Sequence, residues 1–118
     1  MRRRHHDLKA WQQAIELVKA IYTLTASFPP SEMYGLVAQM RRAAVSVPSN
    51  IAEGAARETS KEFAQFLIIA RGSLSELETQ IRISVELGFC PRENKADGIV
   101  DEMFKLLAGL IKAQRQES

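Results

Sequence analysis

The sequence predicts an all-α fold, an antiparallel up-down-up-down four-helix bundle. Apolar residues recur at steps of three and four along the chain, which is the period of a helix face, and no segment alternates with the period of two that a strand requires. Breaks containing proline or glycine divide the chain into four segments of helical length joined by short connections. The 118 residues, of which 46% are hydrophobic and 25% charged, are enough for one domain with its own core.

The first helix is predicted over residues 8–26. The segment Phe28-Pro29-Pro30 ends it, because proline cannot continue a helix and biases the residue before it toward extended geometry. Its apolar residues form two neighbouring stripes, Leu8-Trp11-Ile15-Val18-Tyr22-Thr25 and Ala14-Leu17-Ile21-Leu24.

The second helix is predicted to start near Ser31, which is a suitable N-cap, and to run through Ile51. Pro48 lies inside its apolar run and removes the hydrogen bond to the carbonyl of Ala44, so we expect a kink there. The alternative is two shorter helices, with Pro48 in the first turn of the second.

The third helix has the clearest boundaries. Thr59 and Glu62 have the spacing of a capping box at its start. Gly88 is expected as the C′ residue at its end, with Phe89 folding back onto the helix and Pro91 blocking continuation. Its apolar stripe keeps a four-three rhythm and consists of Phe63, Leu67, Ala70, Leu74, Leu77 and Ile81.

The fourth helix is predicted to open near Asn94 and to fray from Gln114 onward. It also carries two apolar stripes, so the first and fourth helices both have wide apolar faces. These faces indicate either ordinary core breadth or a second buried face used for self-association. The stripes of the fourth helix are Ile99-Met103-Leu106-Leu110 and Val100-Phe104-Leu107-Ile111.

The chain therefore divides into a basic tail, residues 1–7, and a single bundle domain, residues 8–115. The formal net charge is +2, and the tail arginines alone supply three positive charges, leaving 13 basic residues against 14 acidic ones. The body thus lacks the strongly basic surface typical of nucleic-acid-binding proteins. No signal peptide or membrane span is recognisable, so we expect a cytoplasmic protein with no membrane partner.

Catalytic and metal-binding patterns are missing from the sequence. The two histidines, His5 and His6, fall in the tail, which we expect to be disordered, and have no partners at ligand spacing. Nucleophilic catalysis needs a base beside the nucleophile, and no histidine of the bundle can serve. A Gly-rich phosphate loop and Glu-x-x-His motifs are also absent. We therefore predict no enzymatic activity, no cofactor, no metal and no small-molecule substrate.

Polar residues of the second and third helices form the first candidate site. If the two helices pack as an antiparallel hairpin, residues whose numbers sum to about 117 face each other. Arg41 or Arg42 would then pair with Glu76, and small residues such as Gly72 would allow the backbones to approach closely. The resulting polar set is either a buried network that fixes helix register or a ligand or partner site. It comprises Arg42, Ser46, Asn50, Glu53, Ser73 and Glu76.

Basic residues form the second candidate site, one for nucleic acid. Within the bundle they alternate with glutamates, a pattern also typical of a solvated helix face. The tail could contact phosphates, and oligomerisation would bring several tails together and raise their combined charge. The candidates are Arg2, Arg3, Arg4, Arg41, Arg42, Arg57 and Lys61.

Residues 7–88 resemble one known family, the four-helix-bundle proteins encoded by intervening sequences in bacterial 23S ribosomal RNA genes. The fourth helix matches only as a generic apolar helix. The matching pieces, in chain order, are Leu8-x-x-Trp11-x-x-Ala14, Tyr22-x-x-Thr25-x-x-Phe28-Pro29, Glu32-x-x-Gly35-Leu36, Gln39-x-x-Arg42-Ala43-Ala44-x-Ser46, Asn50-Ile51-Ala52-Glu53-Gly54, Glu62-Phe63, Phe66-Leu67, Ala70-x-Gly72-Ser73 and Glu76-x-Glu78.

The resemblance implies a four-helix bundle that assembles as a homopentamer. It also implies relatedness to the accessory protein of diversity-generating retroelements, which partners a reverse transcriptase and nucleic acid. No catalytic activity is attached to the family. We therefore expect a non-enzymatic oligomer with RNA or DNA as a candidate partner; the alternatives are a protein-interaction adaptor without a nucleic-acid role and an enzyme acting through Asn50, Glu53 and Glu76.

Overall fold

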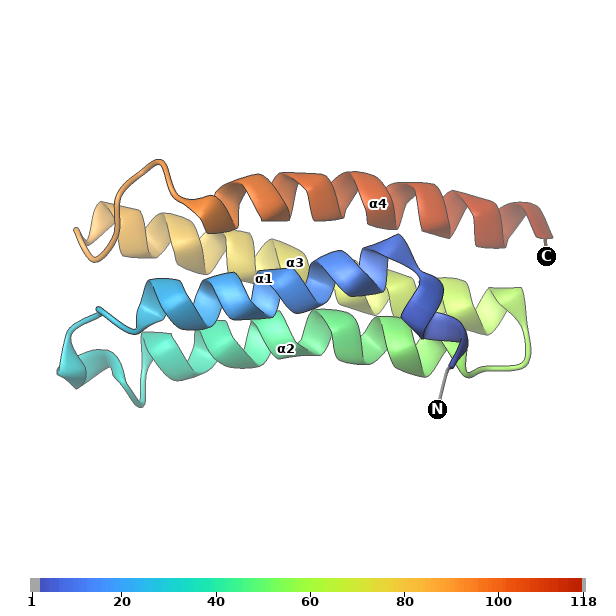
Figure 1. Ribbon diagram of the computed structural model, residues 1–118, viewed down its shortest axis with the longest axis horizontal. Coiled ribbons are helices and arrows are strands. Elements are labelled where there is room, and N and C mark those ends of the chain that lie inside the picture. The colour runs from blue at the N-terminus through green and yellow to red at the C-terminus, as the bar shows by residue number, and fades with distance from the viewer. Residues whose placement is uncertain (1–2, 118) are drawn as a thin grey trace.

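A computed structural model describes residues 3–117 of the chain. Within this range the protein is built from long helices and two short 3-10 turns, and it contains no strand. The chain direction reverses from each long helix to the next, as the colour gradient shows (Figure 1). The predicted up-down-up-down bundle is therefore confirmed. The elements are η1 (Arg4–Asp7), α1 (Lys9–Thr25), η2 (Pro30–Glu32), α2 (Leu36–Ala55), α3 (Ser60–Glu86) and α4 (Lys95–Glu117).

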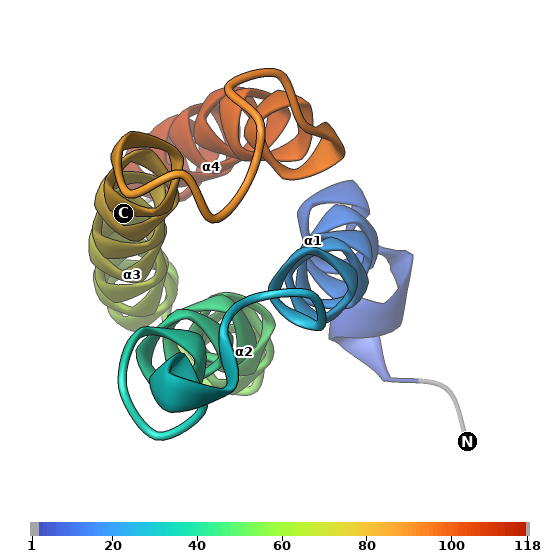
Figure 2. The same ribbon diagram turned by 90° about the vertical axis from the view of Figure 1, so that its left-hand side faces the viewer.

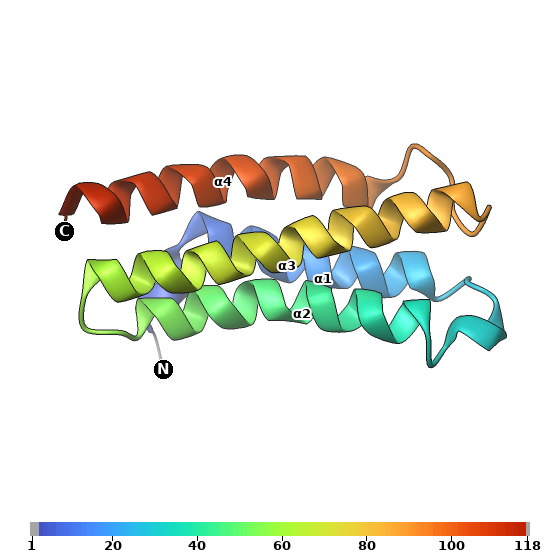
Figure 3. The same cartoon turned by 180° about the vertical axis from the view of Figure 1, so that it is seen from behind.

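The four long helices surround one apolar core. The view along the bundle places α1, α2, α3 and α4 in cyclic order, so that the α1–α4 and α2–α3 pairs lie on opposite sides (Figure 2). Seen from behind, α3 passes between α2 and α4 along the length of the bundle (Figure 3). Each helix contributes its predicted inner stripe, because burying that stripe removes the most apolar surface from water. Fully buried members include Leu17, Ile21, Met40, Ile51, Phe63, Leu67, Leu74, Leu77, Met103 and Leu107.

The second helix begins later than predicted. Ser31 belongs to η2 and does not cap α2, which starts at Leu36 after Gly35. The prolines at positions 29 and 30 favour a tight turn at the start of the connection rather than the first turn of a long helix. The side chain of Glu32 takes over part of the capping role, since its Oε1 accepts a hydrogen bond from the backbone N–H of Leu36 at 3.4 Å.

The proline at position 48 does not divide the second helix. Because α2 continues from Leu36 to Ala55 as one element, the alternative of two shorter helices is wrong, while the expected kink stays a prediction. Polar side chains bond to carbonyls of the turn around the proline ring. Ser49 Oγ donates to the carbonyl of Val45 at 2.8 Å, and Asn50 Nδ2 donates to the carbonyl of Ser46 at 2.8 Å.

Both predicted ends of the third helix are confirmed. Thr59 Oγ1 accepts a hydrogen bond from the N–H of Glu62 at 3.1 Å, as an N-cap does. At the other end Gly88 has a φ of 80°. The N–H of Phe89 bonds to the carbonyl of Ser84 at 2.9 Å, which makes a Schellman motif. The ring of Phe89 folds back and lies 5.6 Å from that of Phe28, so the α1–α2 and α3–α4 connections touch.

The fourth helix starts as predicted but does not fray. Asn94 Oδ1 accepts a hydrogen bond from the N–H of Asp97 at 3.0 Å. The helix continues to Glu117, and the predicted fraying from Gln114 is wrong for the described residues. Gln114 is buried because it follows Leu107 and Ile111 at core spacing. Glu117 Oε2 also accepts a hydrogen bond from Ser60 Oγ at 2.9 Å.

The expected disorder of the N-terminal histidines is also wrong. They belong to η1, which folds against the start of α1. The rings of His5 and His6 lie 5.1 and 5.2 Å from that of Trp11. Gln12 Nε2 donates to the carbonyl of His6 at 2.8 Å, which closes the turn onto the helix. The large apolar face of Trp11 explains why this short basic segment is ordered.

Candidate functional site: a polar groove and a basic end

A polar groove of about 330 Å³ lies between α2 and α3. Four residues of the predicted polar set line it, two from each helix, so the structure brings most of that set together. Three further residues of the groove wall were not singled out from the sequence. The predicted members are Arg42, Ser46, Ser73 and Glu76, and the added ones are Gln39, Ala43 and Gln80.

Hydroxyl and amide groups tie the two helices together at the groove. The hydroxyl oxygens of Ser46 and Ser73 are 2.8 Å apart and share a hydrogen bond. Asn50 Nδ2 donates to Ser46 Oγ at 2.9 Å. Sequence reasoning placed Ala44 opposite Ser73, so the observed register is displaced from the predicted one by two residues of α2.

The ion pair expected at this groove does not form. Arg41 points toward α1 instead, because successive residues of a helix are turned by about 100°. Its Nε donates to Thr25 Oγ1 at 3.0 Å, and its guanidinium lies 4.4 Å from the ring centroid of Tyr22. Arg42 and Glu76 are exposed and take part in no hydrogen bond or ion pair within residues 3–117.

The glutamate at position 53 lies apart from the polar set. Glu53 Oε1 accepts from a guanidinium nitrogen of Arg57 at 3.1 Å, and both side chains are exposed. Such a surface pair contributes little to stability. The geometry therefore does not assemble Asn50, Glu53 and Glu76 into one catalytic group.

The close approach of the two helices occurs at Gly54 and not at Gly72. A Cβ added to Gly54 would lie 2.7 Å from Cβ of Phe66 and 2.9 Å from Cδ1 of Phe63. A Cβ added to Gly72 would meet nothing within 4 Å. The prediction that Gly72 sits at a tight crossing is thus wrong, because Gly72 lies on an exposed side of α3.

The buried polar residue of this groove that sequence reasoning missed is Gln80. Its side chain is only 6% exposed, and its buried Oε1 has no hydrogen-bond partner among residues 3–117. An unsatisfied buried polar atom costs about 1–3 kcal/mol, so the amide is available for a partner that enters the groove. Its spacing of seven residues from Ser73 and four from Glu76, on one face of the helix, was the signal that could have revealed it.

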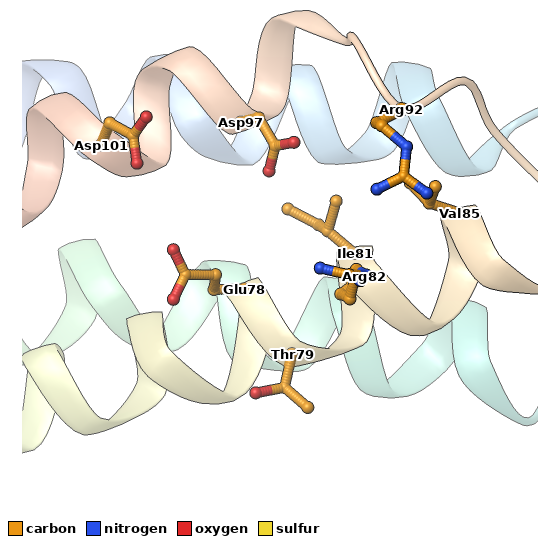
Figure 4. A pocket seen from close by; sticks show the side chains of 8 residues that line it. All are labelled: Glu78, Thr79, Ile81, Arg82, Val85, Arg92, Asp97 and Asp101. Atoms are coloured by element: carbon orange, nitrogen blue, oxygen red, sulfur yellow. The ribbon is translucent and has the colours of Figure 1, made fainter.

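A second groove, of about 470 Å³, lies between α3 and α4. Carboxylates of Glu78 on α3 and of Asp97 and Asp101 on α4 border it (Figure 4). Burial, together with the nearby charge of Asp101, raises the pKa of Asp97. Burial, with a smaller contribution from Asp97, also raises the pKa of the Cys90 thiol, so its reactive thiolate form is disfavoured.

The candidate nucleic-acid residues fall into two groups. The guanidinium of Arg4 lies 5.2 Å from the ring centroid of Phe63, and that of Arg57 lies 4.7 Å from that of Phe66. These rings are one helical turn apart, so both arginines belong to the end of the bundle that holds the α2–α3 turn and the N-terminus (Figure 1). Arg3 and Lys61 lie at this same end. Arg41 and Arg42 lie elsewhere, in the first half of α2, and Arg2 is outside the described residues.

These features define the class of the protein. It is an all-helical, up-and-down four-helix bundle with polar grooves, and residues 3–117 contain no group of three or more His, Cys, Asp or Glu that could hold a metal ion. No helix in that range is both long and apolar enough to cross a bilayer.

The chain matches the model of the 23S rRNA-intervening sequence protein family over residues 6–110, and it belongs to that family. The resemblance drawn from the sequence is thereby confirmed. A search of curated proteins finds no match to the chain.

Proposed function

We propose that the protein is a non-enzymatic module that self-associates and contacts nucleic acid through the basic end of its bundle. The homopentamer implied by the family resemblance is the proposed stoichiometry. The main support for self-association is an apolar groove of about 320 Å³ between α1 and α4. It is lined by Leu8, Lys9, Ala10, Lys105, Leu106, Gly109, Leu110 and Ala113.

The shape of this groove suits a helix from another copy. Three leucines and three small residues line it beside two lysines, so apolar side chains of a neighbour can be buried there. Apolar surface of this kind at the edge of a bundle is typical of an interaction site. The wide apolar faces of the first and fourth predicted helices meet at this groove.

Light scattering on the purified protein at micromolar concentration tests the self-association. We expect a mass several times the 13.2 kDa of one chain, and a lower mass for Leu110→Glu, which places a charge inside the groove. Lys112→Glu, which alters an exposed residue of α4, is the matched control. A wild-type protein that stays monomeric would contradict the proposal.

The grouping of Arg3, Arg4, Arg57 and Lys61 at one end supports the nucleic-acid contact. In an oligomer, several such ends act together, and phosphate contacts of this kind weaken steeply with salt. Titrating RNA and DNA across a salt series should show salt-sensitive binding that is lost in a variant with Arg2, Arg3 and Arg4 all changed to Ala. An unchanged melting temperature would show that this variant folds. Absence of binding at low salt would favour the protein-interaction adaptor instead.

A further inference from the structure

A second stripe with the spacing of a coiled-coil seam runs along α3, at the edge of its contact with α2. Its members follow one another at steps of four, three, four, three and four residues, a pattern that keeps side chains on one gently winding line. Three of them are large exposed apolar residues, with Ile69 51%, Ile83 44% and Leu87 58% exposed. The stripe consists of Ile69, Ser73, Glu76, Gln80, Ile83 and Leu87.

Polar atoms at the centre of this stripe lack partners within the described residues 3–117. Gln80 Oε1 is buried and unpaired, and Glu76 makes no hydrogen bond or ion pair within residues 3–117. Arg42, which lines the same α2–α3 groove, is equally unengaged. Polar residues at the centre of a helical seam set its register, because each needs a matching group across the contact.

The stripe is complementary to itself when two copies of α3 run antiparallel. In an antiparallel seam the layers pair positions related by a two-fold axis, and an axis passing midway between Glu76 and Gln80 generates three kinds of layer. Leu87 of one copy meets Ile69 of the other. Ile83 meets Ser73, beside the open surface at Gly72.

The central layers of this arrangement join complementary polar groups. The amide N–H of Gln80 in each copy donates to the carboxylate of Glu76 in the other, because both Gln80 Oε1 and the carboxylate can only accept. The same approach brings that carboxylate to the groove lined by Arg42, which places opposite charges together.

We propose that a second copy of this chain docks on the α2–α3 face through an antiparallel, two-fold contact between the two α3 helices. The apolar layers at both ends supply the buried surface, and the Glu76–Gln80 layers at the centre fix the register. This face lies on the side of the bundle opposite the α1–α4 groove (Figure 2), so the contact is additional to assembly through that groove. If the α1–α4 groove builds a pentamer, this two-fold contact joins two pentamers into an even-numbered assembly of ten chains.

Paired cysteines test the register directly. In a Cys90→Ser background, the double variant Ser73→Cys, Ile83→Cys should be linked into dimers by a short bis-maleimide. Each single variant should not be linked, because two copies of the same position lie 10 residues apart along the seam, about 15 Å at 1.5 Å per residue. Dimers formed equally by the single variants, or absent from the double variant, would overturn the proposal.

Charges placed in the apolar layers test the contact in solution. Ile69→Glu with Ile83→Glu should weaken the α3 association about tenfold or more and remove the even-numbered species in light scattering. Ser75→Glu, at an exposed position away from the stripe, should leave the mass unchanged. If Leu110→Glu lowers the mass while the isoleucine variant does not, assembly through the α1–α4 groove stands and the two-fold contact is wrong.

Discussion

The two opposite seams of the bundle are held together in different ways. Between α2 and α3, a glycine at position 54 lets the helices touch, and the Ser46–Ser73 hydrogen bond crosses the interface about two turns away. Between α1 and α4 the contact is mainly apolar. One polar link, from Gln13 Nε2 to Glu102 Oε2 at 2.8 Å, accompanies an open groove lined by leucine and alanine.

The α2–α3 seam fixes how its two helices are aligned, whereas the α1–α4 seam mainly holds its two helices together. Steric fit at one glycine and directional hydrogen bonds allow only one alignment of α2 against α3. Apolar contact between α1 and α4 stabilises the pair but tolerates sliding, since the hydrophobic effect is non-directional. The α2–α3 hairpin therefore sets the geometry to which the other two helices adapt.

The largest expected effect comes from testing the steric fit. Gly54→Ala puts a methyl group 2.7 Å from Cβ of Phe66, and overpacking of this kind costs about 1–3 kcal/mol of unfolding free energy. Gly72→Ala, where a methyl group meets nothing within 4 Å, should stabilise by up to about 1 kcal/mol through helix propensity. Urea unfolding of both variants measures the contrast. Equal effects at the two glycines would remove the basis for a tightly fitted α2–α3 seam.

The next prediction compares the stability contributed by the Asn50–Ser46 hydrogen bonds with that of the exposed Glu53–Arg57 pair. Asn50→Ala removes two hydrogen bonds to Ser46 and should destabilise the fold by about 1 kcal/mol. Glu53→Ala removes only the exposed pair with Arg57 and should change stability by less than about 0.5 kcal/mol. Thermal melts of both variants are the measurement, and a larger loss for Glu53→Ala would contradict the arrangement of this groove.

On the other side of the bundle, the polar link between Gln13 and Glu102 should matter less. Gln13→Ala removes the half-buried bond to Glu102, which water can replace, so we expect a loss of about 0.5–1 kcal/mol. A double-mutant cycle over Gln13 and Glu102, set against one over Ser46 and Ser73, compares the two seams directly. A stronger coupling on the α1–α4 side would reverse the assignment of register to the α2–α3 hairpin.

The smallest effect concerns charge in the groove between α3 and α4. Because the pKa of Asp97 is raised above its ordinary value of 3.8, the folded chain binds this proton more tightly than the unfolded chain does. The free energy of unfolding contributed by Asp97 therefore falls as the pH rises from 3.8 through the folded pKa. Asp97→Asn should lose this slope and gain stability relative to wild type with rising pH, as urea titrations at several pH values would show. If Asp97→Asn instead became less stable relative to wild type as the pH rises, the folded protein would favour the charged form of Asp97.

Most of the fold could be predicted from helical periodicity and end signals. Thr59, Gly88 and Asn94 each marked a helix end through local chemistry that depends on few neighbours, and each prediction holds. The start of α2 was wrong because Ser31 is a good cap only if the chain enters a helix there, and two prolines direct it into a turn first. The ordered N-terminus depends on contact with Trp11, which no local pattern encodes.

The candidate site was predictable in its members but not in its pairings. Helical spacing correctly gathered Arg42, Ser46, Ser73 and Glu76 at one groove. Gly72, however, lies on an exposed side of α3, and Arg41 contacts Thr25 and Tyr22 of α1 instead of Glu76. Register depends on the close contact at Gly54, and spacing along one helix says nothing about which glycine meets its neighbour.

The ring contact between Phe28 and Phe89 has a consequence for local unfolding. It joins the α1–α2 and α3–α4 connections, at the end of the bundle opposite the one that holds Arg4 and Arg57. Chain segments at the ends of helices usually open first and exchange their amide hydrogens fastest. Because the rings of Phe28 and Phe89 pack together, the last turns of α1 and α3 should unfold as one cooperative unit. The amide protons of both turns should then show the same protection in hydrogen exchange.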